Sequence, residues 1–189
     1  MAIPRSGGTL LRPIGFTRAT RGPLQLLQAV GYTGIYEEGR RQKPVCNAVA
    51  CWVFNEPWPR AANNSLVAWP NELKPSYYAV AAANRPVIPS ARIPRFDWPR
   101  GGELSTTLFL LNDSPHSIGA LVFSVRLVAG DESTALGTWQ RPGTKANMHC
   151  AGPVVRGFVP VSPGQTSYLV VEVTGRPEFF SCYTLAFAR

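Results

Sequence analysis

The sequence contains no long hydrophobic run. No stretch of about 18 consecutive apolar residues occurs, which predicts that the chain has no membrane-spanning helix. The first residues, MAIPRSGGTLLRPIGFTRATRGPL, also lack the unbroken apolar core of a secretory signal. They are rich in Arg, Gly and Pro instead. We therefore expect residues 1–23 to form a basic, disordered arm.

Acidic residues are also scarce. The 189 residues contain 11 Asp and Glu against 19 Lys and Arg, which gives a net charge of +8, and seven of the basic residues lie within the first 43 positions. Clustered cations can bind nucleic acids by releasing phosphate counterions. Here, however, the charges are spaced out among Gly and Pro, and no recognised nucleic-acid module accompanies them. We expect a solvated basic segment and no nucleic-acid partner.

Cysteine and histidine are too few and too scattered for a typical metal site. The four cysteines are Cys46, Cys51, Cys150 and Cys182, and of the two histidines only His149 adjoins one of them. A structural zinc site needs two close pairs of ligands, or Cys with His at tight spacing. We therefore expect free thiols, no metal and no cofactor. A Cys150–Cys182 disulfide and the redox compartment are left open.

The first half of the chain has a mixed helix and strand pattern. Apolar residues recur at helical spacing from Leu24 to Tyr36, and the segment EEGRRQK suits the end of that helix before Pro44. The uncharged run VCNAVACWVF, residues 45–54, is typical of a strand buried on both faces. A loop rich in turn residues follows, and Pro75 suits the first turn of a second helix. The pattern predicts helix, buried strand, loop and helix over residues 24–85.

After Arg85 the pattern changes to short runs of alternating apolar and polar residues. Turn sequences such as PRGG, NDSPHS and AGDES separate these runs. About seven strands fit into roughly 100 residues, which is typical of an immunoglobulin-like β-sandwich. The predicted fold class is therefore α+β, with the β-sandwich over residues 86–189.

The step Asn55-Glu56-Pro57 raises the question of catalysis, because such a step often carries the general-acid glutamate of sugar-cleaving barrels. Retaining glycoside hydrolysis needs two carboxyl groups about 5 Å apart. Upstream of Glu56 the only acids are Glu37 and Glu38, on the predicted helix, and nearly all downstream acids fall in the predicted sandwich. Glu56 is therefore interpreted as a substrate-site or structural acid, and no catalytic residue is assigned.

Two segments, GRRQKPVCNAVACWVFNEPWP and KPSYYAVAAANRPV, resemble the C-terminal part of glycoside hydrolase family 2, on its β-mannosidase and exo-β-glucosaminidase side. The shared features are a basic helix end, a Trp-x-x-Asn-acid-x-Trp-Pro step and a Lys-Pro-x-Tyr-Tyr-Ala helix. The resemblance is specific over residues 40–85 and architectural over 86–189. It implies that residues 24–85 form the terminal helix, strand and helix of a TIM barrel. Both catalytic glutamates would then precede residue 24.

The resemblance implies that this chain is a C-terminal fragment of a β-mannosidase-like glycosidase. The full-length protein would hydrolyse O-glycosyl bonds of β-linked sugars, and the fragment would be inactive without an upstream catalytic half. Trp52 would line the floor of the sugar subsite, Asn55 and Glu56 would bind hydroxyl groups, and Trp58 would shape the rim. Alternatively, Trp52 and Trp58 are core or barrel-seam aromatics. Trp69 and Pro70 replace an Asp-Tyr step found in relatives, so specificity in that loop is not transferred.

A second interpretation gives the chain no catalytic role at all. The sandwich would then be a carbohydrate-binding or protein-interaction module. Such a module needs Trp or Tyr side chains on one accessible face, and Trp98 and Trp139 are the candidates. Both tryptophans equally suit core or edge packing.

Overall fold

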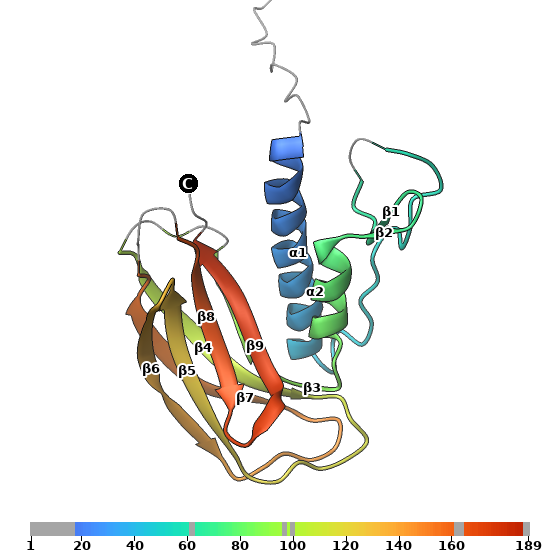
Figure 1. Ribbon diagram of the computed structural model, residues 1–189. Helices are drawn as coiled ribbons and strands as arrows, with labels where there is room; N and C mark the ends of the chain where they lie inside the picture. Colours follow the sequence, from blue (N-terminus) through green and yellow to red (C-terminus); the bar gives the residue numbers. More distant parts are fainter. Residues whose placement is uncertain (1–17, 61–62, 96–97, 99–100, 161–164, 187–189) are drawn as a thin grey trace, which may run out of the picture.

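The computed structural model describes residues 18–60, 63–95, 98, 101–160 and 165–186. This part of the chain is mostly β, with two helices. The helices α1 (Arg18–Arg41) and α2 (Pro75–Ala83) pack along each other and stand beside an antiparallel β-sandwich (Figure 1). Neither helix is long and apolar enough to cross a membrane.

Helix α1 begins earlier than its apolar pattern predicts. Residues 18–23, which the sequence assigns to a basic arm, form its first turns, while residues 1–17 lie outside the described residues. Its last turn carries Arg40 and Arg41, which suits the negative end of the helix dipole. Near this end the chain folds back so closely that a β-carbon on Gly39 would lie 2.3 Å from a methyl group of Val49. Only glycine permits that approach without rearrangement.

The structure has no strand over residues 45–54, where the sequence predicts one buried on both faces. The segment has no regular secondary structure. Its apolar side chains are partly or largely exposed to solvent, with Val45 89% and Trp52 82% exposed. An apolar run becomes a buried strand only where other strands pair with its edges and other elements cover its faces. Among the described residues the first such pairing is an isolated parallel bridge between Asn55 and Val67.

The following loop contains a short hairpin that the sequence pattern does not predict. Its strands β1 (Val67–Ala68) and β2 (Glu72–Leu73) have two residues each. Helix α2 starts at Pro75 as predicted, because proline is tolerated in the first helical turn. The preceding residue, Lys74, occupies the N-cap position without capping the helix through its side chain, which is used elsewhere.

The sandwich contains seven described strands in two sheets. The first sheet has the order β3-β4-β7, from β3 (Val87–Ala91), β4 (Glu103–Asn112) and β7 (His149–Phe158). The second has the order β6-β5-β8-β9, from β6 (Glu132–Arg141), β5 (Leu121–Ala129), β8 (Ser167–Val173) and β9 (Arg176–Ala186). All neighbouring strands are antiparallel. The number of strands agrees with the sequence prediction, and the first of them begins at Val87.

The core lies between the two sheets. Strand β5 alternates strictly between buried residues, such as Phe123 and Leu127, and residues that are partly or fully exposed, and β8 does the same. This period of two points one side of each strand inward. The first strand, β3, is buried at all five positions, because one side faces the core and the other faces α1. It nevertheless contains Pro89, which an outermost strand tolerates.

Candidate functional site

The segment from Trp52 to Trp58 carries the residues that the sequence selects as a sugar site. Trp52 and Trp58 are exposed, at 82% and 56%, and Asn55 is exposed as well. Between them, Phe54 lies edge-on against Tyr77 of α2, with ring centroids 6.3 Å apart. The two indoles therefore do not pack in the core of the described structure. Their assignment to a sugar site stays a prediction.

Glu56 differs from its neighbours, because its side chain is buried. Oε1 accepts hydrogen bonds from the Ser65 hydroxyl at 2.8 Å and from the Lys74 ammonium at 2.7 Å, while Oε2 accepts one from the Trp69 backbone N–H at 3.2 Å. Burial alone would raise the pKa of Glu56, but these hydrogen bonds and the charge of Lys74 outweigh it, so the pKa is lowered. Glu56 is therefore an ionised carboxylate, which is the opposite of a general acid that must hold a proton.

Lys74 uses all three of its ammonium protons in this arrangement. Besides Glu56 it donates to the Ser65 hydroxyl at 2.7 Å and to the Asn63 carbonyl at 3.0 Å. An ammonium group has three donors and no acceptor, so the cation is fully satisfied in its buried position. These contacts of Lys74 with Glu56, Ser65 and Asn63 hold the loop after residue 63 against the end of the Trp52–Trp58 segment. Among the described residues, no second carboxyl group is a hydrogen-bond partner of Glu56.

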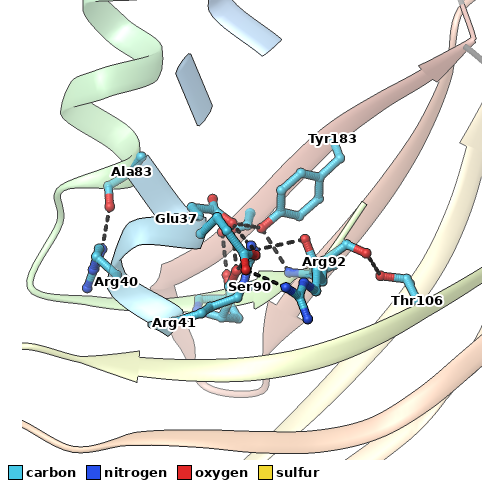
Figure 2. A network of polar contacts seen from close by, with 12 residues as sticks. Glu37, Arg40, Arg41, Ala83, Ser90, Arg92, Thr106 and Tyr183 are labelled. Atoms are coloured by element: carbon cyan, nitrogen blue, oxygen red, sulfur yellow. Dashed lines mark hydrogen bonds and ion pairs between the residues drawn. The ribbon is translucent and has the colours of Figure 1, made fainter. Parts of the chain in front are cut away.

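A second buried carboxylate, Glu37, joins α1 to the sandwich. Its Oε2 accepts hydrogen bonds from Arg41 at 2.8 Å, from Ser90 of β3 at 2.6 Å and from Tyr183 of β9 at 2.8 Å (Figure 2). Burial raises the pKa of Glu37 and outweighs the effect of Arg41 and the two hydroxyl groups. Burial also raises the pKa of Tyr183, as does the charge of Glu37. Tyr183 therefore stays protonated and acts as a donor to Glu37.

A third cluster lies at the other end of this junction, around Asp113. This carboxylate, just after β4, forms ion pairs with Arg40, through Nε at 2.7 Å, and with Lys43. It also meets Nε2 of His149, the first residue of β7, at 2.7 Å. Burial tends to raise the pKa of Asp113, but Lys43, His149 and Arg40 together lower it. Asp113 thus ties the end of α1 to the sandwich.

A cleft of about 1200 Å³ opens between the helix pair and the sandwich. Its walls come from α1, α2, the start of β4, the stretch after β3 and β9, and they are mostly apolar, with Ile35, Tyr78 and Phe180 among the lining side chains. Glu37, Arg41 and Tyr183 also reach it. The Glu37 carboxylate is already paired with Arg41 and Tyr183, while the Nε of Arg41 is buried without a hydrogen-bond acceptor. Among the described residues, no cluster of His, Cys, Asp or Glu is placed to hold a metal ion.

The comparison with solved structures identifies a similar fold. Three structures of the Amycolatopsis orientalis exo-chitosanase, two of them variants in complex with PNP-beta-D-glucosamine, match with a TM-score of 0.63 and 16% sequence identity. The match covers 86% of this chain. The chain shares its fold with part of an exo-chitosanase. It covers only 19% of that protein's length, so the shared part is about a fifth of the exo-chitosanase. No protein-family model and no curated protein sequence matches the chain.

Sequence reasoning found Glu56 but missed the groups that determine its state. Lys74 lies in the Lys-Pro-Ser-Tyr-Tyr segment, and the signal that could have found it is the need of a buried carboxylate for a cation. The sequence suggests Glu37 as a possible catalytic partner, whereas the structure places it in a separate network at the junction with the sandwich. The role of Asp113 has no local sequence signal, because its partners are 36 to 73 residues away in the sequence.

Proposed function

We propose that this chain is the C-terminal part of a glycoside hydrolase of family 2, of the β-mannosidase or exo-β-glucosaminidase type. The observation that carries the proposal is the shared fold with the exo-chitosanase over 86% of the chain. Its order of helix, second helix and sandwich is the one that the sequence motifs imply, apart from the predicted strand over residues 45–54. Two of the exo-chitosanase structures are complexes with PNP-beta-D-glucosamine, which fits a β-linked sugar as the substrate of the intact enzyme.

In this proposal, α1, the segment 45–58 and α2 are the terminal helix, strand and helix of a (β/α)₈ barrel, and β3 to β9 form an immunoglobulin-like sandwich. The exposed apolar side chains support it. Val45, Trp52 and Phe54 are 89%, 82% and 58% exposed, although their segment has the composition of a buried strand. In an intact barrel, neighbouring strands would pair with this segment and cover it.

The proposed sugar-binding residues are Trp52, Asn55, Glu56 and Trp58. A flat, accessible indole such as Trp52 suits the apolar face of a sugar ring. Glu56 would contribute to sugar binding indirectly, because its bond with Lys74 fixes the backbone beside Asn55. The catalytic glutamates would come from an upstream catalytic half, which is the proposed partner of this chain.

Two measurements test this proposal. The purified 189-residue chain should not cleave aryl β-mannosides or aryl β-glucosaminides. Antibodies raised against it should recognise, in the source cells, a polypeptide or complex that co-purifies with such an activity. Turnover by the purified chain, or a native 20.6 kDa polypeptide without co-purifying glycosidase activity, would contradict the proposal.

The alternative is a non-catalytic module whose sandwich binds carbohydrate or a protein. The tryptophans do not favour sugar binding by the sandwich itself. Trp98 is buried in its core, and Trp139 stacks on Phe123 with ring centroids 4.5 Å apart. Phe158, 71% exposed at the end of β7, is the most exposed aromatic side chain among the described strands of the sandwich. Saturation-transfer NMR with mannose and glucosamine would reveal binding to this face, and Phe158→Ala would abolish it.

A further inference from the structure

The outermost strands of the two sheets differ in how their edges are protected. Strands β3, β7, β6 and β9 lie at the four sheet edges. Three of them contain a proline, at Pro89, Pro153 and Pro177, whereas β6 contains none. Proline cannot donate a backbone hydrogen bond, and edge strands often use it to prevent pairing with another chain. Among the described edge strands, β6 is therefore the one that proline does not protect.

The helices protect the opposite side of the sandwich. Glu37 of α1 accepts a hydrogen bond from the Ser90 hydroxyl of β3. Arg85, just after α2, donates hydrogen bonds to the backbone carbonyls of Glu178 and Phe180 on β9. Strand β6 lies on the far side of the sandwich from α1 and α2 (Figure 1). Nothing among the described residues pairs with its outer edge.

The charges of β6 stand only at its two ends. The ten-residue strand begins with Glu132 and ends with Arg141, and the eight residues between them are uncharged. Within the described part of the chain, neither end residue forms an ion pair, and the Nε of Arg141 is enclosed without a hydrogen-bond acceptor. Glu132 pairs in register with Ala129 of β5, and Arg141 pairs with Leu121. Because Ala129 and Leu121 are both inward-facing, Glu132 and Arg141 lie on the same face of the sheet.

We propose that β6 pairs antiparallel with β6 of a second copy of this chain. With the two-fold axis between Leu136 and Gly137, Glu132 of one chain lies opposite the partner's Arg141, and the same pair forms again at the other end. Opposite charges directly across two strands are stabilising, and like charges are destabilising. This single register satisfies both end charges and joins the two four-stranded sheets into one of eight strands. Such a self-complementary contact is what a two-fold dimer requires.

Packing inside the sandwich leaves the outer edge of β6 free for this role. Trp139 lies so close to Gly152 of β7 that a β-carbon there would come within 2.8 Å of its ring, and Leu136 lies similarly against Gly157. The large side chains of β6 are thus directed across to β7. The register on β5 shifts around Leu136, and this bulge falls at the proposed two-fold axis. We expect a weak dimer, because one pair of edge strands buries less surface than a standard interface.

Sedimentation velocity of the full 189-residue chain over a concentration series tests the proposal. The chain should pass from monomer to dimer as its concentration rises. Arg141→Glu and Glu132→Arg should each weaken the dimer at least about tenfold, because like charges then face each other twice. The double variant should restore it. Lys145→Glu, an exposed residue outside β6, changes the net charge as Arg141→Glu does and serves as the control.

Hydrogen exchange provides a second measurement on the unmodified chain. The backbone amides of residues 133–140 should exchange more slowly as the protein concentration rises, while those of β5 should not change. A chain that stays monomeric at every concentration overturns the proposal. So does a dimer that the charge reversals leave unchanged, that the double variant fails to restore, or that forms without slower exchange in β6. This inference does not depend on the proposed glycosidase origin.

Discussion

At the scale of single residues, the pairing of Glu56 with Lys74 carries the clearest energetic consequence. Both side chains are about 95% buried. Removing one member of a buried ion pair leaves the other charge uncompensated in a poorly solvated place. Lys74→Met should therefore lower the free energy of unfolding by about 3–5 kcal/mol.

Urea unfolding followed by circular dichroism measures this change. Lys145→Met removes an exposed cation and is the matched control, with an expected change within about 0.5 kcal/mol. The double variant Glu56→Gln/Lys74→Met should regain part of the loss, because neither side chain is then charged. If Lys74→Met and Lys145→Met changed the free energy of unfolding equally, the ion pair of Lys74 with Glu56 would not contribute to stability.

Glu56 also gives stability a defined pH dependence. Its pKa in the folded chain is below the usual 4.5, so the folded state favours the ionised form. The stabilisation is fully present above the pKa of the unfolded chain and is lost as the pH falls through the lower folded value. The difference in unfolding free energy between the wild type and Glu56→Gln should be constant from pH 6 to 7 and shrink below about pH 4.5. Urea titrations at each pH measure it, and a difference that grows on acidification would reverse the assignment.

The sequence allowed Glu56 to be selected but not its state to be predicted. The Asn-Glu-Pro step suggests a sugar-site acid through its resemblance to a glycoside hydrolase motif. Its ionisation depends on Lys74, Ser65 and the Trp69 backbone, which come from a loop whose conformation has no periodic pattern. Contacts of this kind are set by tertiary folding, which local sequence patterns do not encode.

At the scale of elements, prediction succeeded where the backbone groups of an element find their hydrogen-bond partners within the chain. Helix α2 begins at Pro75 as predicted, and the seven sandwich strands have their partners within the chain. The segment 45–54 has strand composition but no partner strand in the described structure. A strand depends on what lies beside it, so composition alone could not predict its state.

The open segment leads to a prediction about backbone exchange. Among the described residues, no backbone N–H of residues 47–53 has a backbone acceptor, whereas β5 is hydrogen-bonded on both sides. Amides of 47–53 should therefore exchange with water orders of magnitude faster than those of β5. Mass spectrometry of peptic fragments measures this. Equally slow exchange in both segments of the monomeric chain would show that 45–54 is covered.

At the scale of the whole molecule, Asp113 links the helix pair to the sandwich. Asp113→Ala would leave Arg40, whose side chain is 9% exposed, and His149 without their shared acceptor. The expected loss is about 2 kcal/mol, less than for a fully buried pair because Asp113 is 26% exposed. Exchange should accelerate in the last turns of α1 more than in β5. Uniform acceleration in both elements would show that Asp113 acts on global stability alone.

The arrangement of Glu37, Ser90 and Tyr183 has a practical consequence for dividing the chain. Composition changes near residue 85, which invites expression of residues 86–189 alone. Such a piece would lose the acceptor for two hydroxyl groups and uncover the outer side of a five-residue strand that is buried throughout. Helix α1 thus covers one side of the sandwich in addition to packing against α2. A shortened protein that is meant to fold should keep it.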